Sequence, residues 1–226
     1  MRKKTRCKGM VVIYDMKEYT FPFSTCETPQ KDGVAAQPFS AAANLMTCCI
    51  IIFFLIQTKH FYTFSLLLSI LLFESFHTFS HIVHIEGPIQ INITHFLTYV
   101  MNAAFFAVFY HYTHVFPSEV FLFYMSALIA LDIYAFSNFD FVYYLGTQSL
   151  VFISILLYYF TLLPAKVQTS IYWICGLVAF VILLFINEQF NCERMLAFYP
   201  DFPYHIFIES VGVILFYTIC SHFYDL

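Results

Sequence analysis

The stretch ESFHTFSHIVH, from Glu74 to His84, places one acid, three histidines and two serines inside a run that is otherwise apolar enough to sit in lipid. An ionisable side chain in a membrane helix costs about 2.5 kcal/mol or more, so its presence calls for a partner or a function. Imidazole and carboxylate groups are ligands that suit zinc, and in membrane helices they also relay protons. The stretch therefore indicates a metal site or a proton pathway at membrane depth.

Helical periodicity places the ionisable residues of this stretch on one face. Glu74, His77, His81 and His84 fall within an arc of about 80°, because each residue of a helix turns about 100°. His77 and His84 lie about 10 Å apart along the axis and cannot share one ion, whereas His81 can share an ion with either of them. The helix can therefore offer one or two ligands. Ser80, one turn before His84, could hydrogen-bond a ligand or a bound water.

Further candidate ligands lie near the expected starts of two other helices. His95 opens the third helix, and His205 with Glu209 opens the seventh; residues four apart share a helical face, so this last pair can bind one ion together. With helices that run alternately up and down, these starts and the end of the second helix fall on the same side of the membrane. Three protein ligands and a water form the catalytic arrangement of zinc. We therefore predict a zinc site drawn from His84, His95, His205 and Glu209.

The composition indicates the elements that must position these side chains. Of 226 residues, 61% are apolar and only 11% are charged, which is typical of a polytopic membrane protein and not of a soluble domain. A helix needs about 20 mostly apolar residues to cross the membrane. Seven segments qualify in this chain: 39–57, 62–83, 95–112, 118–136, 141–163, 168–186 and 204–222.

The predicted fold class is an all-α membrane protein with a seven-transmembrane helix bundle. Residues 39–226 form the bundle, and residues 1–38 form a polar N-terminal arm. We expect Asp132, late in the fourth helix, to be a buried helix partner or an interfacial residue and not a catalytic one. The chain carries no basic stripe of the kind that binds nucleic acid, so a nucleic-acid partner is not expected.

Lysines close to helix ends predict the orientation in the membrane. Lys59 in the first loop and Lys166 in the fifth loop place those loops in the cytosol. The N-terminus is then lumenal and the C-terminus cytosolic, in a membrane of the endoplasmic reticulum or Golgi. The basic cluster from Arg2 to Lys8 argues weakly for the opposite orientation, but it lies far from the first helix.

The cysteines divide into two groups. Cys48, Cys49, Cys175 and Cys220 fall inside helices, where a cysteine behaves as a small apolar residue. By contrast, two further cysteines lie in polar segments on the predicted lumenal side, and each is followed by Glu. A disulfide between the arm and the sixth loop is therefore a candidate, and it would join Cys26 to Cys192.

These residues resemble the alkaline ceramidases, which belong to a larger group of seven-helix proteins that includes the progestin and adipoQ receptors. That family carries Ser-x-x-x-His late in the second helix, an Asp eleven residues after that His, and His-x-x-x-His in the seventh helix. In this chain the corresponding positions are held by Ser80, His84, His95, His205 and Glu209.

Both ends of the chain also look like the ceramidase branch. The segment CETPQKDGVAAQPFSAAANLMT, residues 26–47, is similar to its arm and first helix, and FINEQFNCE, residues 185–193, is similar to the end of its sixth helix. The two cysteines are joined in that family, so the resemblance implies a Cys26–Cys192 disulfide. The family's calcium site is poorly kept: Glu27 remains, but Gln37 and Pro29 replace expected ligands, so calcium is not expected.

Two positions depart from the family pattern where its chemistry lies. His95 stands in place of Asp, and Glu209 in place of the last His, so three histidines and one carboxylate are still present. The resemblance implies His84, His95 and His205 as zinc ligands, Glu209 as fourth ligand or base, and Ser80 as a donor to the developing oxyanion. His81 is the reserve ligand. A second register uses His77 and His81 in place of Ser80 and His84, sets Asn92 against the family's Asp, and puts the metal a turn deeper; we favour the first register.

The resemblance implies an intramembrane zinc hydrolase whose partner is a membrane lipid. The expected reaction cleaves the amide of a ceramide-like lipid to a sphingoid base and a fatty acid. One alternative is a seven-helix receptor or lipid-binding protein that keeps zinc for structure, and another is a transporter in which buried His and Glu relay protons. The exchanged positions leave a changed or lost reaction open, and the sequence sets no oligomeric state.

Overall fold

A computed structural model gives the structure of the chain. It describes residues 26–27, 30, 33–83, 88–137, 141–200 and 202–224, and within these the side chains of 88–91, 141–143 and 145 are left aside. The described residues form helices and contain no strand. The predicted arm lies mostly outside this part of the chain, which begins at Cys26.

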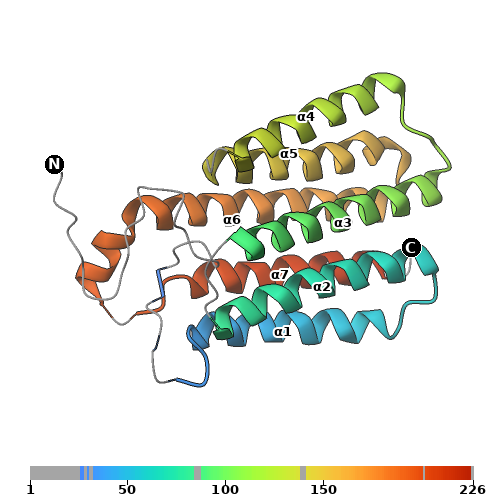
Figure 1. Ribbon diagram of the computed structural model, residues 1–226. Helices are drawn as coiled ribbons and strands as arrows, with labels where there is room; N and C mark the ends of the chain where they lie inside the picture. The colour runs from blue at the N-terminus through green and yellow to red at the C-terminus, as the bar shows by residue number, and fades with distance from the viewer. Residues whose placement is uncertain are drawn as a thin grey trace.

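The helices follow one another along the chain with short connections (Figure 1). They are α1 (Pro38–Leu55), α2 (Phe61–Val83), α3 (Pro88–Thr113), α4 (Glu119–Ser137), α5 (Phe141–Tyr159) with the short 3-10 turn η2 (Phe160–Leu162), α6 (Ala165–Phe198) and α7 (Ile206–Phe223). Six of them, α1 to α4, α6 and α7, are long and apolar enough to cross a membrane, and the apolar stretch Gly146–Leu162 is shorter. The prediction of a helical, multi-pass membrane protein is confirmed, and a seventh membrane span at α5 stays a prediction.

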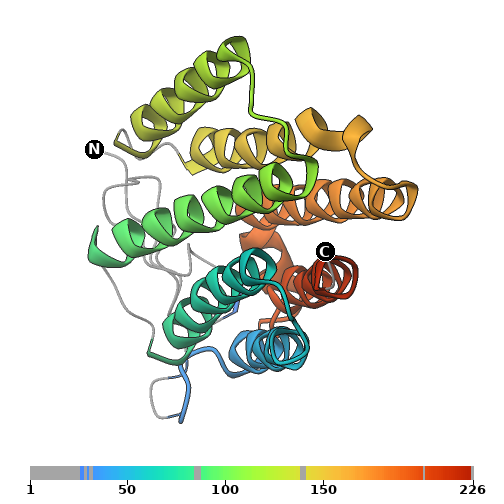
Figure 2. The same ribbon diagram turned by 90° about the vertical axis from the view of Figure 1, so that its right-hand side faces the viewer.

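The bundle is divided into a three-helix group and an outer pair. Helices α1, α2 and α7 pack together at one side, α4 packs with α5 at the other, and α3 and α6 lie between them (Figures 1 and 2). Large apolar side chains such as Phe105, Phe109, Tyr159 and Phe223 are fully buried where these layers meet. The outward faces carry exposed apolar side chains, as expected for helices surrounded by lipid.

The direction of the helices brings three helix ends together. Helices α1 and α7 run in the same direction and α2 runs against them (Figure 1). The starts of α1 and α7 therefore lie at the same end of the bundle as the end of α2. The meeting of the end of α2 with the start of α7 was predicted, whereas the start of α1 was not part of that prediction.

Glu27 caps the start of α1. Its carboxylate accepts hydrogen bonds from the backbone N–H of Phe39 at 3.0 Å and of Ser40 at 3.1 Å, and from the Ser40 hydroxyl. Carboxylates favour helix starts because the first N–H groups have no partner inside the helix. Glu27, the one acid kept from the expected calcium set, is thus engaged by the helix.

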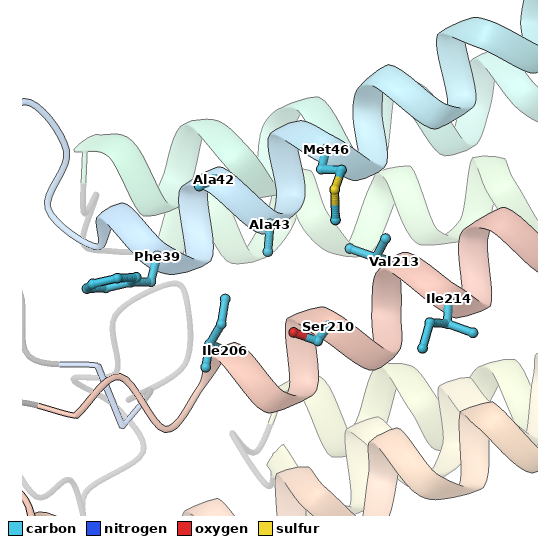
Figure 3. Close-up of a pocket in the computed structure, with 8 residues that line it drawn as sticks. All are labelled: Phe39, Ala42, Ala43, Met46, Ile206, Ser210, Val213 and Ile214. Carbon is cyan, nitrogen blue, oxygen red and sulfur yellow. The ribbon is translucent and has the colours of Figure 1, made fainter.

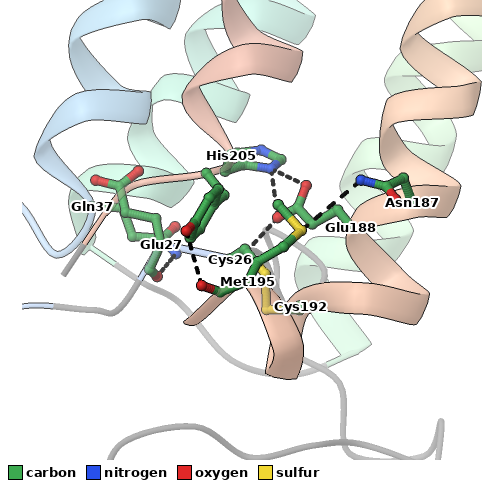
Figure 4. Close-up of a disulfide and its surroundings, with 9 residues drawn as sticks. Cys26, Glu27, Gln37, Asn187, Glu188, Cys192, Met195 and His205 are labelled. Carbon is green, nitrogen blue, oxygen red and sulfur yellow. Dashed lines mark hydrogen bonds and ion pairs between the residues drawn. A yellow bond between two sulfur atoms is a disulfide. The ribbon is translucent and has the colours of Figure 1, made fainter. Parts of the chain in front are cut away.

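The Cys26–Cys192 disulfide is present and joins the arm to α6, with a Cα–Cα distance of 5.7 Å. This confirms the predicted pair. Cys192 lies inside α6, however, and not in a loop, because the helix continues to Phe198, well beyond the predicted span. The longer helix carries Glu188 and Cys192 to the same end of the bundle as the start of α7 (Figure 4).

Candidate metal centre

Three imidazole rings converge on one carboxylate oxygen where α2 ends and α7 begins. Glu209 Oε1 lies 3.6 Å from His77 Nε2, 3.3 Å from His81 Nε2 and 2.8 Å from His205 Nε2. The Nε2 atoms of His77 and His81 are themselves 3.1 Å apart. We call these four residues the His3Glu cluster; all are buried except His77, which is partly exposed.

Two helical pairs build this cluster. His77 and His81 are four residues apart on α2, and His205 and Glu209 are four residues apart at the start of α7, so each pair projects from one face. His205 precedes α7 but has helical backbone angles, φ −60° and ψ −24°, which keep it in phase with Glu209. Two antiparallel helices, together with the residue that directly precedes α7, therefore supply all four side chains.

The second nitrogen of each ring faces an acceptor elsewhere in the protein. His81 Nδ1 lies 2.8 Å from Gln37 Oε1, and His205 Nδ1 lies 2.8 Å from Glu188 Oε2. His77 Nδ1 lies 3.5 Å from Glu74 Oε2. Metal-binding histidines in proteins have such acceptors, which hold the proton on one nitrogen and leave the other to bind the metal. The rings are thus oriented with Nε2 toward Glu209.

A polar atom at the centre supports the metal interpretation. Glu209 Oε1 is buried and makes no hydrogen bond of good geometry within the described chain, although three ring nitrogens surround it. His77, His81 and Glu209 place one ligand atom each within 4.8 Å of one another, which is close enough to share an ion. His205 lies outside this set of three, but its Nε2 faces Glu209 Oε1 at 2.8 Å. Three imidazoles and a carboxylate fit a divalent transition metal such as zinc.

His205, which lies just before the α7 membrane span, is held between two acids. Burial by itself lowers the pKa of His205, but the carboxylates of Glu188 and Glu209 outweigh it and raise this pKa to about 10. Without metal, these two carboxylates therefore favour a protonated ring, with Glu188 facing Nδ1 and Glu209 facing Nε2. Metal binding at Nε2 must displace that proton.

The favoured register of the sequence differs from this arrangement. The structure joins His77 and His81 to Glu209, which is the register that we had favoured less, and His81 is a member of the cluster instead of a reserve. Ser80, the expected oxyanion donor, lies 100° round the helix from His81 and donates its hydroxyl to the Phe76 carbonyl at 2.9 Å. His84 lies outside the described residues.

His95 is placed in a second polar cluster and not beside Glu209. Its Nε2 lies 3.2 Å from Asp132 Oδ2 on α4. Asp132 also accepts hydrogen bonds of 2.5 Å each from the Tyr99 hydroxyl, the Thr147 hydroxyl and the Gln148 amide. Asp132 is fully buried and ties α3, α4 and α5 together, as expected of a buried helix partner.

The arm contacts His81 directly and reaches His205 through Glu188. Gln37 reaches His81 directly, while the backbone N–H of Cys26 donates to Glu188 Oε1 (Figure 4). The backbone N–H of Tyr204, next to His205, donates to the Cys26 carbonyl at 3.2 Å. The disulfide thus anchors a segment that orients His81 and His205.

Sequence reasoning missed three residues of this centre. His77 belonged only to the less favoured register, although its spacing from His81 equals that of His205 from Glu209. Glu188 could have been found from its place one turn before Cys192. Gln37 was noted only as a lost calcium ligand, and no sequence signal pointed it at His81.

An apolar groove of about 480 Å³ runs between α1 and α7 beside the cluster (Figure 3). Its walls are Phe39, Ala42, Ala43 and Met46 on α1, and Ile206, Ser210, Val213 and Ile214 on α7. Ser210, its one polar lining residue, directly follows Glu209. The size and lining suit a hydrocarbon chain.

Comparison with known proteins adds no relative: no family model, no curated protein and no solved structure matches this chain.

Proposed function

We propose that the protein is a membrane-embedded zinc hydrolase that cleaves the amide bond of a ceramide-like lipid, giving a sphingoid base and a fatty acid. The observation that carries the proposal is the His3Glu cluster, in which three rings turn Nε2 toward Glu209 while Nδ1 faces Gln37, Glu188 or Glu74. Such anchored ligand sets hold catalytic metals. The resemblance of the sequence to alkaline ceramidases supports the reaction class.

The residues of the chain have distinct roles in this proposal. His77, His81 and His205 would hold the ion, and zinc bound there would polarise the amide carbonyl and lower the pKa of a water molecule to about 7. Glu209 is placed to accept a proton from the attacking water and to return it to the leaving nitrogen. The water oxygen bonds to the acyl carbon as the C–N bond breaks, so the products are a carboxylic acid and an amine.

The α1–α7 groove supports a lipid as the substrate. Both of its walls belong to helices long and apolar enough to span a membrane, so a chain can enter from the bilayer. Because Ser210 follows Glu209, an acyl chain in the groove has its reactive end next to the cluster. A fatty acyl amide therefore fits the site better than a soluble amide does.

The disulfide also supports a proposal for the compartment. Cys26–Cys192 lies at the same end of the bundle as the cluster, and disulfides persist in oxidising compartments. We infer that this end faces the lumen of the endoplasmic reticulum or Golgi, in agreement with the positions of Lys59 and Lys166.

Two measurements test the proposal. Elemental analysis of the purified protein in detergent is expected to give about one zinc per chain, and a ceramide panel is expected to show fatty-acid release. His81→Ala should abolish both, whereas His60→Ala, an exposed histidine at the other end of α2, should change neither. Bound zinc with no amide or ester turnover would instead favour a receptor with a structural metal, and absence of metal would refute both zinc functions.

A further inference from the structure

Asn44 is a buried amide with an unused donor. Its side chain lies on α1 with 2% of its surface exposed, and its Nδ2 has no hydrogen-bond partner within the described residues. A buried donor without a partner costs about 1–3 kcal/mol. The chain carries this cost in the middle of a helix whose neighbouring positions are apolar or satisfied.

The helical phase of Asn44 directs it at the seam between α2 and α7. Ala43, 100° away on one side, lines the groove with α7. Cys48, 40° away on the other side, contacts Ser75 and Thr78 of α2 through its sulfur. Asn44 therefore faces the space between these two helices, which are the helices that supply the His3Glu cluster.

The depth of Asn44 matches that of the cluster. Helices α1 and α7 run in the same direction, and Ala43 and Met46 share the groove with Ser210 and Val213 (Figure 3). Asn44 is thus level with the turn of α7 that begins at Glu209. The unused amide, the groove and the cluster lie at one level of the bundle.

We propose that Asn44 binds the lipid substrate by donating a hydrogen bond from Nδ2 to its amide carbonyl oxygen. This role rests on the proposed function. It adds a residue that holds the amide bond to be cleaved in position, between the groove and the His3Glu cluster. With the acyl chain of the lipid in the groove, the amide group at the end of that acyl chain reaches the space between α2 and α7 at the level of Asn44. A neutral amide donor is suited to this oxygen, whose negative charge grows as the carbonyl is attacked.

Asn44 offers the hydrogen-bond donor that Ser80 does not provide. The Ser80 hydroxyl is already bonded to the Phe76 carbonyl, whereas Asn44 Nδ2 is free of any such bond within the described chain. A donor left unpaired in the free protein is available to a ligand without breaking an existing hydrogen bond. This is the pattern expected where stability is given up for binding.

The test compares Asn44→Leu with Thr47→Val in the full-length protein. Thr47 lies on the same face of α1, is equally buried, and already bonds the Ala43 carbonyl at 3.3 Å, so it is a matched control. Binding of a C6 ceramide is measured on chelator-treated protein in detergent, where no cleavage interferes, and thermal unfolding is measured without lipid. Asn44→Ala, which adds no volume, serves as a second variant.

We expect Asn44→Leu and Asn44→Ala to weaken ceramide binding about 5- to 10-fold, while Thr47→Val leaves it unchanged. The melting temperature of Asn44→Leu should equal or exceed that of the wild type, because an unpaired donor has been removed. Wild-type affinity in both Asn44 variants, or a lowered melting temperature of Asn44→Leu, overturns the inference while leaving the proposed function intact. A wild-type protein that neither binds nor cleaves ceramide overturns both.

Discussion

Replacement of Gln37 by Leu tests the link between the arm and the metal centre. Gln37 is 1% exposed, and both polar atoms of its side chain have partners: Oε1 lies 2.8 Å from His81 Nδ1, and Nε2 donates to the Glu27 carbonyl at 2.9 Å. Its backbone N–H, which the substitution keeps, donates to the His81 carbonyl at 3.0 Å. Gln37→Leu therefore removes the acceptor that orients the His81 ring while keeping the backbone contact.

Two separate effects follow from these contacts. Loss of a hydrogen-bonding partner behind a metal-binding histidine costs about 10- to 100-fold in metal affinity, which is about 1.4–2.7 kcal/mol. Loss of two buried hydrogen bonds lowers the free energy of unfolding of the metal-free protein by about 1–3 kcal/mol. The first effect appears only when metal binds, so the two are separable.

The assay is competition for zinc between the purified protein and a chromophoric chelator at fixed pH, with denaturant unfolding of the metal-free form in parallel. Gln57→Leu is the control, since Gln57 is exposed beyond the other end of α1, where its side-chain amide donates to the Phe53 carbonyl at 2.8 Å. Zinc affinity of Gln37→Leu within threefold of the wild type would refute the role of Gln37 in orienting His81.

Three further outcomes test other contacts. Cys26→Ser combined with Cys192→Ser loosens the segment that donates to Glu188, so zinc affinity in the same competition assay should fall about tenfold; unchanged affinity would show that the disulfide does not support the site. Asp132→Ala removes the acceptor shared by three donors of α3 and α5, so urea unfolding should show the free energy of unfolding lowered by about 3 kcal/mol or more. Its zinc content should be unchanged. The control Ser126→Ala, at an exposed position on the same helix, should leave the stability unchanged. Chelation should lower the melting temperature, and zinc at 100 times its Kd should restore about 2.7 kcal/mol of the free energy of unfolding. A melting temperature that does not change with zinc would argue against the metal centre.

The sequence was sufficient to predict the helices and one of the two residue pairs of the site. Long apolar segments predict membrane helices because the bilayer imposes their length, and a spacing of four predicts that His205 and Glu209 share a face. The disulfide could be predicted because Cys26 and Cys192 lie in polar segments on the same predicted side of the membrane. Where α6 ends was not predictable from hydropathy, since the helix continues into the polar residues around Cys192.

The choice of register on α2 lay beyond the sequence. His77, His81 and His84 share one arc of the helix, so periodicity cannot say which two meet Glu209. That choice depends on how far α2 slides along α1 and α7, and the backbone bond from Gln37 to the His81 carbonyl marks this depth. The partner of His95 was equally unpredictable, because Asp132 of α4 becomes its neighbour only when the α4–α5 pair docks on α3.

Charge balance gives an independent reason for a cation in this centre. Three buried carboxyl groups, Glu74, Glu188 and Glu209, surround the imidazole rings, and each is less than 5% exposed. Buried carboxylates are stable only when positive charges or donors face them. The rings can supply positive charge only by binding protons, and a ring protonated at both nitrogens cannot bind a metal. A divalent cation among the Nε2 atoms supplies two positive charges while each ring keeps a single proton facing its acceptor. The same contacts that orient the rings thus also favour an occupied site over an empty one.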